Sequence, residues 1–158
     1  MDGDNAARMA GDGGDDSSED ENDESSPLFR HNGLQEIREN NPSMTSFRLS
    51  GDHENITNKA WAWIGRDISN NTHLISLSLR EEALNDHKMS CLFRGLTRSS
   101  SIENMWLYKN NLSIAGLRSM VPFFQHANSL KSLEIDGNNI QSEGFNMMFR
   151  ALSDRLKR

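Results

Sequence analysis

The sequence predicts an α/β solenoid, a short arc with parallel strands on its concave side and helices on its convex side. An apolar pattern that starts at Leu74 recurs at Ile102 and again at Leu130, and an earlier copy with a two-residue insertion starts at Met44. Early in each unit apolar and polar residues alternate, as in a strand buried on one face; later, apolar residues recur at every fourth position, as in a helix. Because one such unit cannot bury its own apolar face, we expect the units to stack around one continuous core.

The period predicts where each element lies. The four repeats span residues 44–73, 74–101, 102–129 and 130–158. The expected strands are 45–49, 75–79, 103–107 and 131–135, and the expected helices are 58–69, 86–98, 114–126 and 142–156. One helix position carries a large apolar residue in every unit, namely Trp61, Met89, Leu117 and Phe145. We expect these side chains to fill the core between neighbouring helices.

Residues 28–43 are expected to form an N-terminal helical cap in front of the first strand, with its helix within 29–40. Leu34 and Ile37 are three residues apart and therefore share one helical face, which can cover the first unit. Pro42 then stops the helix, because the residue before a proline is disfavoured in the helical conformation.

Asn110 and Asn138 occur just after the third and fourth predicted strands. An asparagine at this place can point inward and hydrogen-bond the backbone of a tight turn, which would otherwise be buried without partners. The second unit has Glu82 at this position, and the first has Asp52 or Glu54. We therefore expect the turns of the first two units to be less regular.

The charge of the chain is divided unevenly. The 158 residues carry a formal net charge of −6, but residues 1–27 hold ten acidic residues and one basic residue, which gives that segment −9 and the remainder +3. This segment lacks aromatic residues and almost all branched aliphatic ones, so it is expected to be a disordered acidic tail. It serves either to keep the chain in solution or to bind weakly to basic partners or to the basic body itself.

The composition argues against several classes of protein. Cys91, the single cysteine, cannot form an internal disulfide, and a buried thiol within a helix is expected. The acidic N-terminus is unlike a signal peptide, and no apolar stretch approaches the ~20 residues of a membrane span. We expect a cytoplasmic protein, with the nucleus as an alternative, that does not bind membranes. The histidines show no zinc-binding spacing and no catalytic motif is present, so we expect no metal, no cofactor and no enzymatic activity.

The repeat itself resembles a known class. Residues 130–148 (LKSLEIDGNNIQSEGFNMM) and 102–120 (IENMWLYKNNLSIAGLRSM) follow the frame L-x-x-L-x-L-x-x-N-x-L-x-x-x-G-x-x-x-L, which resembles the ribonuclease-inhibitor-like leucine-rich repeats. This resemblance implies an α/β horseshoe arc and, for most members, protein binding. Residues 34–49 (LQEIRENNPSMTSFRL) and 70–79 (NNTHLISLSL) look like the opening of the leucine-rich domain of tropomodulins and leiomodins. That narrower resemblance implies a short helix, ending in an Asn-Pro turn, that caps the first strand.

The concave face is the predicted binding surface. Strand residues that alternate with the buried ones point to this face, and most of them are small and polar. The candidate partner-binding residues are Arg48, Arg80, Trp106, Tyr108, Glu134 and Asp136. Two large aromatics between arginines and carboxylates match the composition of binding hot spots. The alternative interpretation is that the two rings only stack on each other and on neighbouring strands.

These observations favour a protein-protein interaction module that binds a protein partner on its concave face. A nucleic-acid groove would need a continuous basic strip, whereas the last strand contributes carboxylates, so no nucleic acid is expected. One alternative is a regulator of a small GTPase, since the Ran GTPase-activating proteins use this repeat class and carry an acidic segment. Another is an actin- or cytoskeleton-binding domain, as the tropomodulin-like opening implies.

The C-terminal end of the predicted arc lacks a polar closing unit. The strand at 131–135 would have a free edge, and free edges invite pairing with another chain. Either the natural chain continues beyond residue 158, or a partner or a second copy covers this end. Self-association through the uncapped edge is therefore expected as an alternative to a longer chain.

Overall fold

The computed structural model describes residues 32–49, 56–155 and 157, in which helices and strands alternate. The helices are α1 (Asn32–Arg38), α2 (Asn58–Asn70), α3 (Asp86–Leu96), α4 (Ile114–His126) and α5 (Ser142–Arg155). The strands are β1 (Ser46–Arg48), β2 (Ser76–Ser78), β3 (Asn104–Trp106) and β4 (Ser132–Glu134). None of the described helices is both long enough and apolar enough to cross a membrane.

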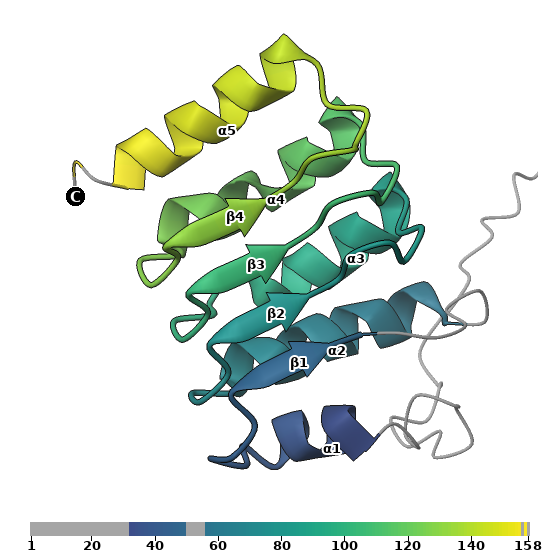
Figure 1. Cartoon of the computed structure of the whole chain (residues 1–158), viewed down its shortest axis with the longest axis vertical. Helices are drawn as coiled ribbons and strands as arrows, with labels where there is room; N and C mark the ends of the chain where they lie inside the picture. The colour runs from purple at the N-terminus through teal and green to yellow at the C-terminus, as the bar shows by residue number, and fades with distance from the viewer. Residues whose placement is uncertain (1–31, 50–55, 156, 158) are drawn as a thin grey trace, which may run out of the picture.

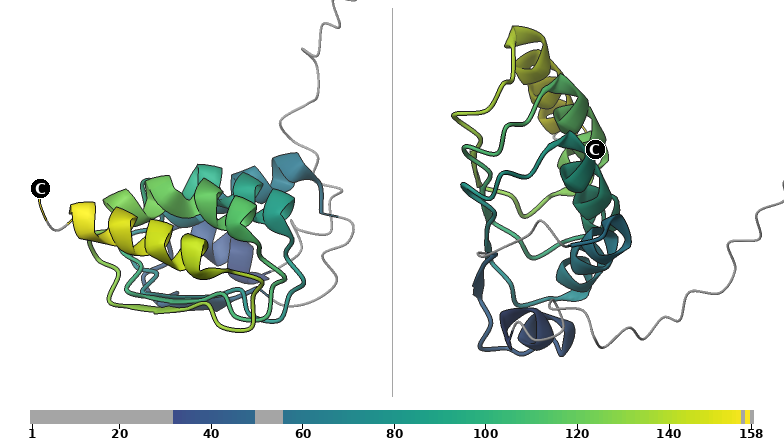
Figure 2. Two further views of the ribbon diagram at one scale, coloured as in Figure 1. Left: turned by 90° about the horizontal axis from the view of Figure 1, so that it is seen from above. Right: turned by 90° about the vertical axis from the view of Figure 1, so that its right-hand side faces the viewer.

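The four strands form one parallel sheet in the order β1-β2-β3-β4 (Figure 1). Helices α2 to α5 lie on one face of this sheet, and α1 lies at its β1 end (Figure 2). Ser76 pairs with Asn104 and Asn104 with Ser132, so each strand pairs with the equivalent position of the next repeat. Ser46 pairs with Ser76 in the same way, so the insertion in the first unit does not disturb the register. The predicted α/β repeat solenoid is confirmed.

The core lies between the sheet and the helices. The central strand residues Phe47, Leu77 and Met105 are buried, and Leu133 in β4 is partly buried. The helix residues Trp61, Met89 and Leu117 are fully buried, and Phe145 in α5 is partly buried. Cys91 is a buried free thiol, as predicted. The burial of these apolar side chains is the main force that holds the repeats together.

The strands are three residues long, shorter than the five predicted. Their flanking residues still bond to the neighbouring unit: the Ile75 N–H donates to the carbonyl of Thr45, and the Leu79 N–H to that of Trp106, both at 2.9 Å. The regular ladder stops because the chain turns directly after each strand. The predicted acidic tail (1–27) and the residues Asp52 and Glu54 of the first turn lie outside the described residues.

Helix α1 lies within the range predicted for the cap helix. Its Leu34 and Ile37 are buried against the rest of the core. The Asn71 side chain, at the end of α2, donates a hydrogen bond to the carbonyl of Ile37 at 3.0 Å. Arg38 adds an ion pair with Asp67 of α2, at 3.0 Å. These contacts fix α1 on the first repeat.

The two predicted asparagines point inward and bond the turns. The Asn138 side-chain oxygen accepts from the N–H groups of Asn110 at 2.9 Å and Leu112 at 3.1 Å. Its amide group donates to the carbonyls of Leu107 at 2.9 Å and Ile135 at 2.6 Å. The asparagine of one repeat therefore holds both its own strand end and the turn of the preceding repeat.

The prediction of a less regular turn at Glu82 is wrong. The residues on either side of Glu82 have φ angles of 60° and 50°, and the equivalent residues in the next repeat both have 57°. Asn110 supplies the hydrogen bonds, since its side-chain oxygen accepts from the N–H groups of Glu82 at 3.1 Å and Leu84 at 3.3 Å. The residue that organises this turn belongs to the next repeat, so the side chain at position 82 does not need to do so.

We expect Asn110→Ala to lower the free energy of unfolding by about 3 kcal/mol, because each buried backbone group left without a partner costs about 1–3 kcal/mol. Chemical denaturation with a circular dichroism readout measures this loss. The control is Asn128→Ala, which removes an exposed asparagine from the short turn between α4 and β4 and should change stability by less than about 0.5 kcal/mol. Equal effects of the two substitutions would contradict the role given to Asn110.

Candidate partner-binding face

One face of the sheet carries no helix in the described part of the chain, and we call it the open face (Figure 2). It is the face that the sequence predicts to be concave. Its residues are Ser46, Arg48, Ser76, Ser78, Arg80, Asn104, Trp106, Tyr108, Ser132, Glu134 and Asp136. The strand residues among them are exposed or partly exposed and alternate with the core residues, as the period of two requires.

The register of the sheet places the six predicted partner-binding residues in two neighbouring rows. The first row runs across the strands as Arg48, Ser78, Trp106 and Glu134, each paired with the next. The second row contains Arg80, Tyr108 and Asp136, two residues further along their strands. Backbone hydrogen bonds continue the alignment there, from the Glu81 N–H to the Tyr108 carbonyl and from the Lys109 N–H to the Asp136 carbonyl, both at 3.0 Å. All six residues therefore lie on one surface.

Tyr108 lies close to two cations. The Arg80 guanidinium carbon and the Lys109 ammonium nitrogen are each 5.8 Å from the centre of its ring. Cations at this distance are attracted to the face of an aromatic ring. Trp106, the other predicted aromatic, is partly exposed, and in the described part of the chain no ring contact joins it to Tyr108. The two rings therefore present separate apolar surfaces.

The sequence did not single out Glu81, which forms an ion pair with Lys109 at 2.8 Å. The hydrogen bond and the charge of Lys109 lower the pKa of Glu81, and Arg80 and Arg48 lower it further. In turn, Glu81 raises the pKa of Lys109. The two residues are 28 positions apart, one period of the repeat, as are Lys131 and Glu103, which also form an ion pair at 2.8 Å. Opposite charges on residues that are one repeat apart are the sequence signal that predicts both ion pairs.

The two arginines of the open face differ from Lys109 in their surroundings. Among the described residues, no carboxylate forms an ion pair with Arg48 or Arg80. At the opposite end of the same rows, Glu134 and Asp136 are exposed. The open face is therefore basic at β1 and β2, aromatic at β3 and acidic at β4.

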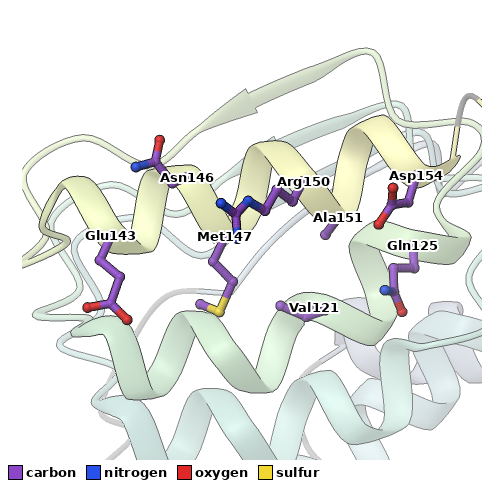
Figure 3. A pocket seen from close by; sticks show the side chains of 8 residues that line it. All are labelled: Val121, Gln125, Glu143, Asn146, Met147, Arg150, Ala151 and Asp154. Atoms are coloured by element: carbon purple, nitrogen blue, oxygen red, sulfur yellow. The ribbon is translucent and has the colours of Figure 1, made fainter.

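A second concave feature lies on the helix layer. It is a groove of about 410 Å³ between α4 and α5, seen in Figure 3. Its lining residues are Val121, Gln125, Glu143, Asn146, Met147, Arg150, Ala151 and Asp154. None of the six predicted partner-binding residues contributes to it. Within the described residues, no group of three or more His, Cys, Asp or Glu side chains is placed to hold a metal ion.

Two solved structures are similar to this chain to different degrees. The structure entitled "Leiomodin-1 Actin-Binding Site 2 (ABS2)" matches with a TM-score of 0.62 and 15% sequence identity, over 84% of this chain and 92% of that chain. The tropomodulin C-terminal domain from Caenorhabditis elegans matches with a TM-score of 0.49 and 15% identity, over 80% of this chain and 93% of that chain. No model of a protein family matches the chain, and a search of curated proteins gives no match.

The leiomodin structure supports the fold that the sequence predicts, a parallel sheet with alternating helices in the leucine-rich-repeat-like arrangement. It also agrees with the narrower of the two resemblances, the one carried by residues 34–49 and 70–79. Membership of the ribonuclease-inhibitor-like class stays a prediction. At 15% identity the likeness concerns the fold, and the role of the open face has to be argued from its own residues.

Proposed function

We propose that this chain is a non-enzymatic interaction module that binds a partner protein on the open face. The observation that carries the proposal is the pair Trp106 and Tyr108, which lie on adjacent rows of the open face between arginines and carboxylates. Tryptophan, tyrosine and arginine are the residues most often found to dominate binding energy at protein interfaces. The serines around them are small and leave room for the side chains of a partner.

The charge distribution of the open face supports a protein as the partner. Arg48 and Arg80 at one end and Glu134 and Asp136 at the other require a ligand with charges of both signs in the reverse order. Such a pattern contributes mainly to the orientation and the rate of association, whereas the aromatic pair contributes most of the affinity.

Actin is a second candidate for the partner. The specific observation in its favour is the fold likeness to a leiomodin structure whose title names an actin-binding site and of which 92% is covered. A shared fold supports many functions. The actin candidate can therefore be wrong while the general proposal of a protein partner on the open face remains valid.

We also propose that the outer side of α5, which exposes Phe149, binds a second copy of the chain. Phe149 on α5 is 61% exposed, whereas Phe93, at the same repeat position on α3, is fully buried. The next helix covers Phe93, whose ring meets that of Phe123 edge-to-face with centroids 5.3 Å apart. A second copy offers Phe149 a similar apolar surface, its own α5.

Replacing both aromatics, Trp106→Ala with Tyr108→Ala, should weaken binding of partners isolated with the wild-type chain at least tenfold. A hot-spot residue contributes about 2 kcal/mol or more, and about 1.4 kcal/mol corresponds to a factor of ten. Affinity capture followed by titration of the purified partner measures the change. Trp63→Ala is the matched control, because Trp63 is a partly exposed tryptophan on α2, in the helix layer. An unchanged partner set in the double variant would refute the open-face proposal.

For the actin candidate, we expect the purified full chain to bind actin monomers or to co-sediment with actin filaments, and the double aromatic variant to bind less. Native gel shift and high-speed sedimentation measure the two forms of actin. If the wild-type chain binds neither form, actin is eliminated, while the partner-capture experiment still decides the general proposal.

Self-association should appear as a molar mass that rises with concentration in sedimentation equilibrium. Phe149→Ser should shift the chain toward the monomer, since it removes the exposed ring without touching the core. A monomeric mass at every concentration would exclude the second copy as the occupant of this side of α5.

A further inference from the structure

Two arginines on the open face belong to neighbouring repeats, and no carboxylate of the described residues forms an ion pair with either. Arg48 is the register partner of Ser78, and Arg80 follows Ser78 by two residues on the same side of the sheet. The carboxylate of Glu81, which follows Arg80 in the chain, is bonded to Lys109 at 2.8 Å. Glu82, which is next in the turn, has an interaction of its own. This part of the open face therefore keeps an excess of positive charge.

Two polar atoms at this place, one from Ser78 and one from Arg80, also have no partner in the described part of the chain. The Ser78 hydroxyl oxygen and the Arg80 Nε are both buried and have no hydrogen-bond partner among the described residues. A buried donor without an acceptor is unfavourable, so a change of side-chain conformation that brings Arg80 Nε to an acceptor oxygen on the open face would be favoured. The planar guanidinium group binds carboxylates particularly well, because it presents paired N–H donors to the two oxygens. The site therefore has the donors that bind a carboxylate.

The chain contains a concentrated source of carboxylates. Residues 1–27 include ten acidic residues and have a charge of −9. The described structure starts with α1, which lies at the β1 end of the sheet, the end that carries Arg48 (Figure 1). Glu24 is eight residues before the start of α1, a length that spans up to about 28 Å when extended. Adjacent strands are only about 5 Å apart, so both arginines are within reach of the acidic segment.

We propose that Arg48, Ser78 and Arg80 form a carboxylate-binding subsite and that the acidic residues of segment 1–27 of the same chain are its ligand. The interaction is an electrostatic one made with several alternative carboxylates, so it needs no single acidic residue. Because the ligand is tethered, its effective concentration at the subsite is high even when each contact is weak.

This inference gives the acidic segment a role at the binding face. By occupying the basic end, the segment would compete with partners that offer carboxylates there and leave Trp106 and Tyr108 accessible. The competition with partners rests on the proposed function. The binding of the acidic segment to the subsite does not rest on it and is tested separately. A partner would then be selected for the aromatic and acidic part of the face.

The test uses the full chain with a nitroxide spin label on a cysteine introduced by Ser18→Cys; Cys91 is buried, and the unsubstituted chain serves as the labelling control. Paramagnetic broadening of backbone amide signals reports which surface the segment visits. We expect the signals of Arg48 and Arg80 to lose most of their intensity in low salt, and those of Glu134 and Asp136 to lose little. The broadening should fade in high salt, because the interaction is between exposed charges.

Two double variants decide the assignment. Arg48→Gln with Arg80→Gln should abolish the broadening, whereas Arg94→Gln with Arg118→Gln removes two exposed arginines from the helix layer and should leave it unchanged. Uniform broadening, or broadening that survives in the first variant, would overturn the proposal. A mixture of isotope-labelled chains and spin-labelled chains tests whether the segment binds its own chain or another copy. If the signal loss in this mixture equals the loss within one chain, the segment binds between copies, and the proposal is overturned. Loss of partner binding in the aromatic variant has no bearing on these outcomes.

Discussion

Every repeat of this chain depends on the repeat beside it, for polar as well as for apolar contacts. The apolar dependence is that a single strand and helix leave one face of their core uncovered. The polar dependence is more specific, because the side chain of Asn110 bonds the backbone of the turn at Glu82 and that of Asn138 bonds the turn at Asn110. A turn is therefore completed only when the next repeat has folded onto it. The register of the sheet is therefore fixed by these hydrogen bonds as well as by apolar packing.

The same register builds the open face. A side chain on this face meets the residue at the equivalent position of the next repeat, so the surface is a set of rows whose order along the sheet is the order of the repeats. Trp106 lies between Ser78 and Glu134 for this reason, and Lys109 reaches Glu81 for the same reason. A substitution at one repeat position thus changes one place in one row and leaves the core untouched, which separates the requirements of folding from those of binding.

The period of the sequence was sufficient to predict the fold class, the approximate elements and the rows of the open face, because these follow from spacing alone. Other features depend on which repeat supplies a contact. The side chain of Glu82 alone predicts an irregular turn, whereas the hydrogen bonds that order this turn come from Asn110. The groove between α4 and α5 depends on how Val121 and Met147 fill the space between two helices, which periodicity does not describe. The roles of the six open-face residues stay predictions, because shared rows establish proximity but not a ligand.

The segregation of charge on the open face is more informative than its total. Charges of both signs on every strand would be enough to keep the chain in solution. The ion pairs Glu81–Lys109 and Glu103–Lys131, at the border of the open face, are mixed in this way. Instead, among the described residues, no carboxylate pairs with Arg48 or Arg80, and Glu134 and Asp136 belong to the fourth repeat, two or more repeats away. The Arg80 guanidinium lies beside the Tyr108 ring, and a carboxylate would give it stronger, charge-assisted hydrogen bonds than the ring can. The arrangement therefore favours a ligand that is acidic at one end, and the chain's own N-terminal segment is the acidic ligand that is always present.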